Sequence, residues 1–298
     1  MRLLLILFTF VLTCNISIAQ EYTADLNYVP NGGFNESIVK NDTSDLGEVF
    51  QKIVIDGFDS RFPFYLIQPQ KNPKNRFVIL LHGSGGTKES WIRASGSLST
   101  KYVKLKDSLL SLGFAVIIPE FKYYGERSYE IDFATRGVFW RTKDYRRSLN
   151  TFTTTVRDIR IIMDYLESKS EQPSIVFHAI GYSMGGKLAI LLNSADNRLK
   201  SVVACVPYFK GGRFIRNRFT TDSELKSNLL SVHDLFRFGK LQKSPICILV
   251  GNTDENYTIQ EVEDFYNQLT LEGNSLKIYD AGHYLPESFI SDAILYIE

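Results

Sequence analysis

From about residue 76 to the C-terminus, short apolar segments alternate with longer segments that have helical periodicity. The short segments include FVILL, FAVIIPE, VVACV and ICILV, which are typical of strands buried on both faces of a sheet. Among the longer segments, residues 151–168 place Val156, Ile159 and Met163 at helical spacing. Strands and helices that alternate in this way predict an α/β fold, in which helices cover both faces of a parallel sheet.

Before residue 76 the sequence no longer alternates between apolar and helical segments. Residues 50–57 and 61–69 predict two antiparallel strands around a short FDS turn. Before them, residues 20–47 are polar and rich in turn formers, so we expect an extended arm over the surface. The sequence has neither an internal repeat nor a low-complexity linker, and residues 48–298 are interpreted as one domain. In such a domain, ligands bind at the carboxyl ends of the strands.

The first 19 residues, MRLLLILFTFVLTCNISIA, have the composition of a secretory signal peptide. A basic residue, Arg2, precedes an apolar run over residues 3–12, and small residues precede the expected cleavage after Ala19. The apolar run is too short for a stable membrane span. We therefore expect an exported protein, either secreted or periplasmic. A lipid anchor at Cys14 is an alternative, although Thr13 fits that processing poorly.

The charge balance and the cysteine content indicate whether nucleic-acid binding, a disulfide or a zinc site is expected. The chain has 34 Lys and Arg against 33 Asp and Glu, so no overall field favours nucleic acid. Outside the leader, Cys205 and Cys247 lie on predicted buried strands. Export permits a disulfide between them, but two buried free thiols are expected. The sequence has neither a CxxC pair nor a cluster of His and Cys, so it predicts no zinc site.

The segment HAIGYSMGGKLAILLN, residues 178–193, carries a G-x-S-x-G pattern. A buried strand precedes Ser183, and Leu188, Leu191 and Leu192 follow at helical spacing. Small flanking residues allow a turn so sharp that the serine hydroxyl projects from the sheet edge. The following backbone N–H groups then face the reacting carbonyl. Ser183 is therefore predicted to be a nucleophile, and a solvated serine in a glycine-rich turn is the alternative.

A serine nucleophile needs a base within hydrogen-bond reach. Of the four histidines, only His82 and His283 lie in loops at strand carboxyl ends. His82 opens the glycine-rich HGSGG segment and is expected to shape that loop, which leaves His283 as the base. His178 is predicted to be a core histidine, and His233 a residue on a helix face.

The base in turn needs an orienting carboxylate from another strand end. Asp254 in GNTDENY directly follows a buried strand, whereas its neighbour Glu255 would point elsewhere in most turns. The order Ser183, Asp254, His283 places three suitable groups at three different strand ends. That combination is far more specific than any one of the three residues alone.

Taken together, the serine–acid–histidine order, the GYSMGG turn, the HGSGG loop and the GNTD and AGH elements resemble the α/β-hydrolase superfamily. The last two elements resemble its dienelactone hydrolase-like and prolyl oligopeptidase-like branch. The resemblance implies a mostly parallel eight-stranded sheet with helices on both faces and a small cap, with residues 48–298 as the catalytic domain. It also implies acyl transfer through an acyl-serine, with Ser183 as nucleophile, His283 as base and Asp254 as orienting acid.

The resemblance further implies an oxyanion hole that is formed by the backbone N–H of Met184 and one N–H from Ser84 or Gly85. This mechanism requires no metal or organic cofactor. Two features depart from the family pattern. Dienelactone hydrolases proper use a cysteine nucleophile, so their substrate is not carried over. Glu120 ends a strand where relatives commonly have aspartate, and the sequence does not indicate the consequence.

Two insertions, residues 121–150 and 209–240, follow strand carboxyl ends and are expected to roof the site as a small cap. Both are rich in aromatic residues and arginine. One interpretation is a pocket for an aryl or sugar ester, with an arginine for an anionic group; it would be formed by Tyr123, Tyr124, Trp140 and Arg213. The alternative, which we favour, is a cap whose aromatic residues pack its own small core and whose arginines face water.

The leading hypothesis is a secreted serine hydrolase that cleaves a carboxylic ester of a small molecule or carbohydrate. An oligopeptidase-like serine peptidase is a second hypothesis, although the large extra domain usual in that group is absent from this sequence. A catalytically dead hydrolase fold used for binding is a third, and the presence of serine, acid and histidine at their expected places argues against it. The sequence leaves the oligomeric state open.

Overall fold

The computed structural model describes residues 26–30, 32–43, 48–134, 144–171, 174–209 and 232–298. Nine strands of this part of the chain form one sheet, in the order β1-β2-β3-β5-β4-β6-β7-β8-β9. They are β1 (Ser37–Thr43), β2 (Val49–Asp56), β3 (Arg61–Gln68), β4 (Arg76–Leu81), β5 (Ala115–Pro119), β6 (Val176–Tyr182), β7 (Leu199–Cys205), β8 (Ile246–Gly251) and β9 (Ser275–Tyr279).

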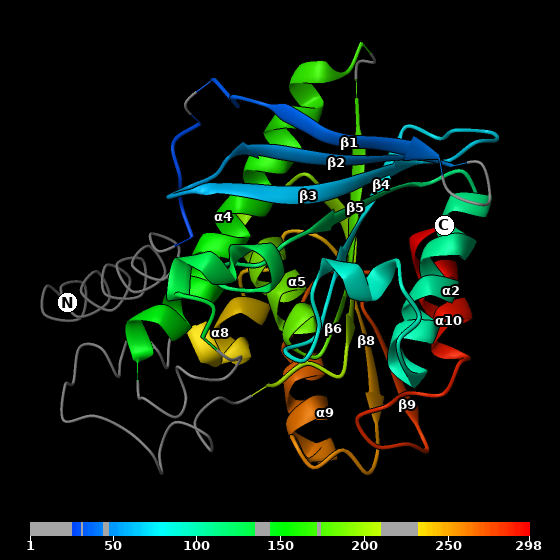
Figure 1. The fold of residues 1–298 in the computed structure, drawn as a ribbon. Helices are drawn as coiled ribbons and strands as arrows, with labels where there is room; N and C mark the ends of the chain where they lie inside the picture. The colour runs from blue at the N-terminus through cyan, green and yellow to red at the C-terminus, as the bar shows by residue number, and fades with distance from the viewer. Residues whose placement is uncertain (1–25, 31, 44–47, 135–143, 172–173, 210–231) are drawn as a thin grey trace, which may run out of the picture.

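The sheet is antiparallel at one side and parallel over the rest. β1, β2, β3 and β5 pair antiparallel in succession, whereas every neighbouring pair from β5 through β9 is parallel. All residues of β5 and β8 are buried, as expected of strands covered on both faces. The carboxyl ends of the parallel strands therefore lie at one edge, which is at the bottom of Figure 1.

Helices cover both faces of the sheet. They are α2 (Ser97–Ser111), α4 (Tyr145–Lys169), α5 (Met184–Ala195), α8 (Leu235–Gly239), α9 (Ile259–Asn267) and α10 (Phe289–Ile297), with 3₁₀ segments η1 (Lys88–Trp91) and η2 (Gly125–Ile131). α2 and α10 pack together on one face. On the other face α4 packs on α5, α5 on α8, and α8 on α9 (Figure 1). No helix in the described ranges is long and apolar enough to cross a membrane.

The structure confirms the predicted α/β class and the mostly parallel sheet, but the expected count of eight strands is wrong. The additional strand, β1, lies within the segment expected to be an extended arm. Its sequence, SIVKNDT, forms an edge strand in which Ile38 is 52% and Val39 60% exposed. An edge strand with so little buried surface needs no apolar alternation, so the pattern that predicts strands is absent from it.

The insertions are described only in part, because residues 135–143 and 210–231 lie outside the described residues. In the first insertion, η2 follows β5, and α4 already begins at Tyr145, earlier than the periodic segment predicts. In the second, the described residues include α8. Cys205 and Cys247 are buried free thiols, as expected.

Candidate active site

Ser183 lies between the end of β6 and the first residue of α5, in a backbone conformation that is rare for a residue with a side chain. Its φ is 56° and its ψ is −114°. The residue is nevertheless held firmly, because its N–H donates to the carbonyl of Cys205 at 2.8 Å and its carbonyl accepts from Lys187 N–H at 3.1 Å. This is the sharp strand-to-helix turn that the G-x-S-x-G pattern predicts.

The glycines on either side of Ser183 are required by close backbone contacts. A Cβ on Gly181 would lie 2.0 Å from the carbonyl oxygen of Gly185. A Cβ on Gly185 would lie 2.1 Å from the carbonyl oxygen of Leu81, at the end of β4. Any side chain at these positions would force α5 away from the sheet, so the two glycines are needed to keep Ser183 in its position at the sheet edge.

Asp254 and His283 come from the loops that follow β8 and β9. The two loops are joined by their backbones, since Thr253 N–H donates to the carbonyl of Ala281 at 3.0 Å. Gly251 permits this approach, because a Cβ there would lie 2.2 Å from the Ala281 carbonyl oxygen. As a result the carboxylate and the imidazole, which are separated by 29 residues, lie within one hydrogen bond of each other.

The three predicted side chains form one hydrogen-bonded line. His283 Nδ1 lies 2.6 Å from Asp254 Oδ2, and His283 Nε2 lies 2.9 Å from Ser183 Oγ. An ionised carboxylate can only accept, so Nδ1 carries the proton and Nε2 accepts the hydrogen bond from the serine hydroxyl. Burial alone would raise the pKa of Asp254, but hydrogen bonds from His283 and the Asn256 backbone outweigh burial and lower that pKa.

Two residues that the sequence analysis did not single out support this line. Tyr182 donates its hydroxyl proton to the His283 carbonyl at 2.7 Å and accepts from Leu285 N–H at 2.9 Å. Asn256 donates its backbone N–H to Asp254 Oδ1 at 3.0 Å and its side-chain amide to the same oxygen at 2.8 Å. Asn256 lies two residues after Asp254, the spacing of a turn in which an aspartate side chain accepts from a backbone N–H, so the sequence carries a signal for this contact. The sequence around Tyr182 indicates only a core aromatic residue.

The loop after β4, residues 82–87 and hereafter the β4 loop, lies against the serine. A Cβ built on Gly83 would lie 3.5 Å from Ser183 Cβ. Ser84 and Gly85 are exposed, and the Ser84 amide makes no hydrogen bond to other described residues. Met184 is the first residue of α5, so its N–H has no partner within the helix. The β4 loop thus approaches the serine at Gly83, and the N-terminus of α5, where negative charge is favoured, begins at the next residue.

His82 is buried, and its Nδ1 donates to the Gly83 carbonyl at 2.8 Å. Its ring stacks on Phe121 at a centroid distance of 3.7 Å. These contacts bear out the expectation that His82 shapes the β4 loop. His178 is buried and bonded to Ser201 Oγ at 2.8 Å, which confirms a core histidine.

His233, predicted to lie on a helix face, lies in a helical turn and is buried. Its Nδ1 lies 2.7 Å from Lys187 Nζ, on the helix that follows the nucleophile turn. Burial lowers the pKa of both groups well below their ordinary values. The amphipathic pattern of the sequence around His233 does not reveal a partner that lies 46 residues away.

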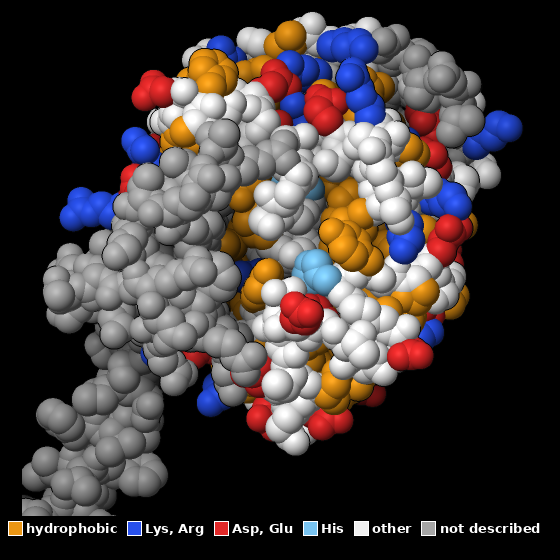
Figure 2. Space-filling view, turned by 60° about the horizontal axis from the view of Figure 1, so that its bottom comes forward, with side chains coloured by type: hydrophobic (Ala, Val, Ile, Leu, Met, Phe, Trp, Pro, Cys, Tyr) orange, Lys and Arg blue, Asp and Glu red, His pale blue; other side chains and the backbone are white. Residues whose placement is uncertain are grey.

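Of the four expected pocket residues, the structure brings Tyr124 to the site. Its hydroxyl contacts Met184 Sδ at 3.5 Å, and its ring lies 5.5 Å from that of His82. Tyr123 lies beside Lys122, whose Nζ is 5.0 Å from the ring centroid. Trp140 and Arg213 lie outside the described residues. Figure 2, which brings the carboxyl ends of the strands forward, shows a hollow where hydrophobic and histidine side chains gather.

The geometry can support nucleophilic attack by a serine on a carbonyl carbon. It offers a hydroxyl bonded to a base, a base bonded to a buried carboxylate, and a helix N-terminus directly after the serine. Among the described residues, no group of three or more His, Cys, Asp or Glu side chains is placed to hold a metal ion.

Several solved structures share this fold. Acetyl xylan esterase 1 from Thermoanaerobacterium sp. JW/SL YS485 superposes with a TM-score of 0.68 at 17% identity, covering 94% of this chain and 92% of that chain. An acetyl xylan esterase from Paenibacillus sp. R4 gives a TM-score of 0.64 at 17% identity and the same coverage. A cold-adapted esterase from an Arctic intertidal metagenomic library gives 0.64 at 15% identity, covering 88% of this chain and 97% of that chain.

No curated protein matches the sequence. The model of one family, however, matches residues 62–288, a span that runs from β3 to the loop before α10. It contains the elements that carry Ser183, Asp254 and His283, and it accounts for more than half of the chain. The chain therefore belongs to the dienelactone hydrolase family.

Proposed function

We propose that the protein is an exported serine esterase. Ser183 Oγ attacks the ester carbonyl carbon while its proton passes to His283 Nε2. The tetrahedral oxyanion is held by the amides of Met184 and Ser84, and one such donor typically contributes about 3 kcal/mol of transition-state stabilisation. Cleavage of the ester C–O bond releases an alcohol, which takes the proton from His283. Water, deprotonated by His283, then attacks the acyl carbon. The bond to Ser183 Oγ breaks, Oγ takes the proton back from His283, and a carboxylic acid is released.

One observation carries this proposal: the continuous line from Asp254 through His283 to Ser183, with bonds of 2.6 and 2.9 Å. The positive φ of Ser183 adds to it, because strain of this kind is kept where the surrounding structure demands it. The carboxylate stabilises the imidazolium that forms during proton transfer, and the lowered pKa of Asp254 keeps it ionised in mild acid.

For the substrate, we propose a short acyl ester of a carbohydrate or another small alcohol. Two of the solved structures that share the fold are named acetyl xylan esterases. The contact of Tyr124 with Met184, the residue after the nucleophile, supports a short acyl group, because a bulky ring near the serine reduces the space for a long chain. Acetyl esters should therefore be hydrolysed faster than octanoyl esters of the same alcohol.

The proposal is tested with p-nitrophenyl acetate, butyrate and octanoate, acetylated xylan, and a peptide anilide. Wild type should hydrolyse the esters, label with a fluorophosphonate, and leave the anilide intact. Ser183→Ala should lose both activity and labelling. Ser194→Ala is the matched control, since Ser194 is a buried serine near the end of α5, the helix that follows Ser183, and its hydroxyl donates to the Leu191 carbonyl. Ester hydrolysis that survives in Ser183→Ala at the wild-type rate would exclude the assigned nucleophile.

Export is proposed from the leader-like residues 1–19, which lie outside the described residues. Mass spectrometry of the protein recovered from a bacterial host should give a mature N-terminus at Gln20. An intact Met1 in the exported fraction would contradict cleavage, and a lipid-modified Cys14 would support the anchored alternative instead.

A further inference from the structure

Glu120 stands directly after β5, at the start of residues 120–132, hereafter the β5 loop. Its side chain has no solvent exposure and lies between the β5 loop and the β4 loop. Both loops reach the nucleophile turn: Gly83 of the β4 loop lies against Ser183, and Tyr124 of the β5 loop contacts Met184. A buried carboxylate at the junction of these two loops is not used in the chemistry proposed above.

The Glu120 carboxylate accepts hydrogen bonds from the β5 loop and from Lys88, the residue that directly follows the β4 loop. Oε1 accepts from the backbone N–H of Lys88, immediately after the β4 loop, at 3.3 Å. Oε2 accepts from Lys88 Nζ at 3.1 Å and from the backbone N–H of Glu126, in the β5 loop, at 3.2 Å. Oε1 also lies 3.9 Å from Nε2 of His82, the first residue of the β4 loop.

The β5 loop is shaped to receive this side chain. Gly125 has a φ of +47°, and a Cβ there would lie 2.0 Å from Glu120 Oε2. The glycine therefore leaves room for the carboxylate and permits the backbone to bend around it. Aspartate would withdraw the carboxylate by about one C–C bond, roughly 1.5 Å, and could not keep the contacts to both loops.

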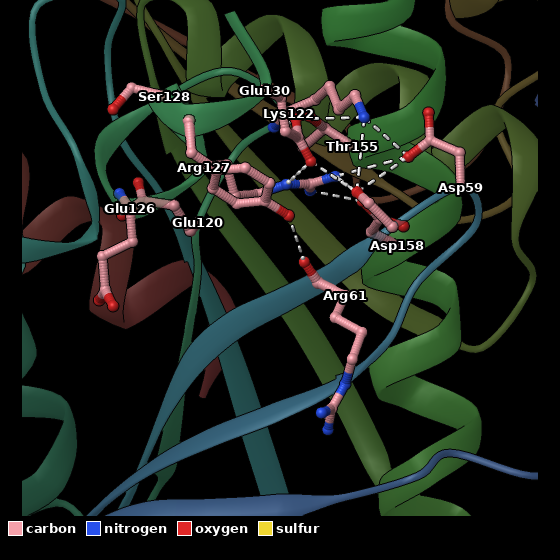
Figure 3. Close-up of polar contacts among 12 residues, drawn as sticks. Asp59, Arg61, Glu120, Lys122, Glu126, Arg127, Ser128, Glu130, Thr155 and Asp158 are labelled. Carbon is pink, nitrogen blue, oxygen red and sulfur yellow. Dashed lines mark hydrogen bonds and ion pairs between the residues drawn. The ribbon is translucent and has the colours of Figure 1, made fainter. Parts of the chain in front are cut away.

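Other ion pairs hold the far side of the β5 loop without touching the β4 loop. Arg127 donates to Asp158 Oδ2 of α4 at 2.6 Å and to Ser60 Oγ at 3.0 Å. Figure 3 shows these contacts converging on Arg127, with Glu120 and Glu126 to one side of them. The β5 loop thus stays attached to α4 when Glu120 is replaced. Lys88 Nζ also donates directly to the half-exposed Glu126 of the β5 loop, so the replacement removes the buried carboxylate between the two loops while this outer ion pair remains.

We propose that Glu120 is a positioning residue, which fixes the β4 loop so that the Ser84 amide faces the oxyanion of the tetrahedral intermediate. The proposal rests on the esterase function proposed above. Its physical basis is that an oxyanion donor acts only at hydrogen-bond distance, and a misplacement of about 1 Å can cost up to about 100-fold in rate. Glu120 would fix the position of the Ser84 amide although its own side chain does not contact the substrate.

The test compares Glu120→Gln and Glu120→Asp with wild type in ester hydrolysis, with the active fraction titrated by a fluorophosphonate. We expect kcat per titrated site to fall by about 10- to 100-fold in both variants, with KM changed less than about threefold. Affinity for butylboronic acid, which forms a tetrahedral adduct on serine, should fall by a similar factor. A merely structural role would lower the titrated fraction and leave kcat per site unchanged.

The matched control is Asp196→Asn. Asp196 is also a buried carboxylate, paired with Arg160 at 3.0 Å and Arg198 at 2.7 Å, but it follows the far end of α5. It should lose stability without losing kcat per site. If Glu120→Gln does not fold, the double variant with Lys88→Met, in which the cation paired with Glu120 is also removed, should fold and show the same fall in kcat.

The proposal is overturned if either foldable variant keeps kcat per site within about twofold of wild type. It is also overturned if neither Glu120→Gln nor the double variant folds, because Glu120 would then serve the whole fold. These outcomes differ from a failure of the esterase assignment, in which wild type itself hydrolyses no ester or Ser183→Ala remains active.

Discussion

The buried imidazole of His178 should make the stability of this protein fall in mild acid. His178 lies on β6 with 1% of its surface exposed, bonded to Ser201 Oγ at 2.8 Å and in contact with Arg76 Nη2 at 3.2 Å. Burial, with smaller contributions from Arg76 and Lys200, lowers the pKa of His178 from 6.5 to about 3. The folded protein thus keeps this side chain neutral where the unfolded chain takes up a proton.

The sign and size of the effect follow from proton linkage. Below the unfolded pKa of about 6.5 the unfolded state binds more protons, so the free energy of unfolding decreases as pH falls, until the folded pKa is reached. The slope is about 1.36 kcal/mol per pH unit, so His178 should contribute a loss of about 2 kcal/mol between pH 7 and pH 5. Because both pH values lie well above the folded pKa, the unfolded pKa sets this loss.

Urea unfolding at pH 7 and pH 5, followed by tryptophan fluorescence, measures the loss. His178→Asn removes the titrating group while its amide can still bond Ser201, so the variant should lose about 2 kcal/mol less than wild type on acidification. Ser201→Ala leaves the imidazole buried and should keep the wild-type dependence. Parallel losses in wild type and His178→Asn would refute the reasoning.

Three further changes test the site directly. Asp254→Asn should lower kcat for p-nitrophenyl acetate by about 10³- to 10⁴-fold, because an amide does not hold His283 in the tautomer that accepts from serine. Gly185→Ala should abolish activity and lower the melting temperature, since its Cβ would lie 2.1 Å from the Leu81 carbonyl oxygen; Gly33→Ala, with no atom within 4 Å, should change neither. Tyr182→Phe should cost about 1–3 kcal/mol in unfolding experiments, because it leaves the His283 carbonyl and the Leu285 amide unpartnered, and it should lower kcat.

The parallel core could be predicted from the sequence because its signal is local. β5 and β8 are apolar throughout, and burial on both faces of a sheet demands that composition. β1 could not be predicted, because an edge strand with exposed Ile38 and Val39 obtains its order from backbone pairing with β2 and not from apolar burial.

The residues of the site also differ in whether their role has a local signal in the sequence. Ser183, Asp254 and His283 each follow a recognisable strand, so a rule about strand ends, combined with the G-x-S-x-G pattern and the order of serine, acid and histidine, could select them. The contacts of Tyr182, Glu120 and the Lys187–His233 pair join segments that are distant in sequence. No local pattern distinguishes Tyr182, Lys187 and His233 from ordinary core or helix positions. Glu120 is recognisable as a strand-end carboxylate, but its partners, like those of the other three residues, are defined only once the chain has folded.

Strand order alone would leave the imidazole far from the serine. Ser183 follows β6 and His283 follows β9, three strands away in the sheet, and a strand spacing of about 4.8 Å puts their strand ends roughly 14 Å apart. A histidine side chain cannot span that distance, so the loop after β9 must fold back across the ends of β8 and β7. The close approach of Gly251 to the Ala281 carbonyl lies at the start of this loop. Further along it, the His283 carbonyl accepts a hydrogen bond from the hydroxyl of Tyr182, the residue before the serine. The residue that ends the strand of the nucleophile therefore also fixes the loop of the base, so a shift of β6 would move both reacting groups together.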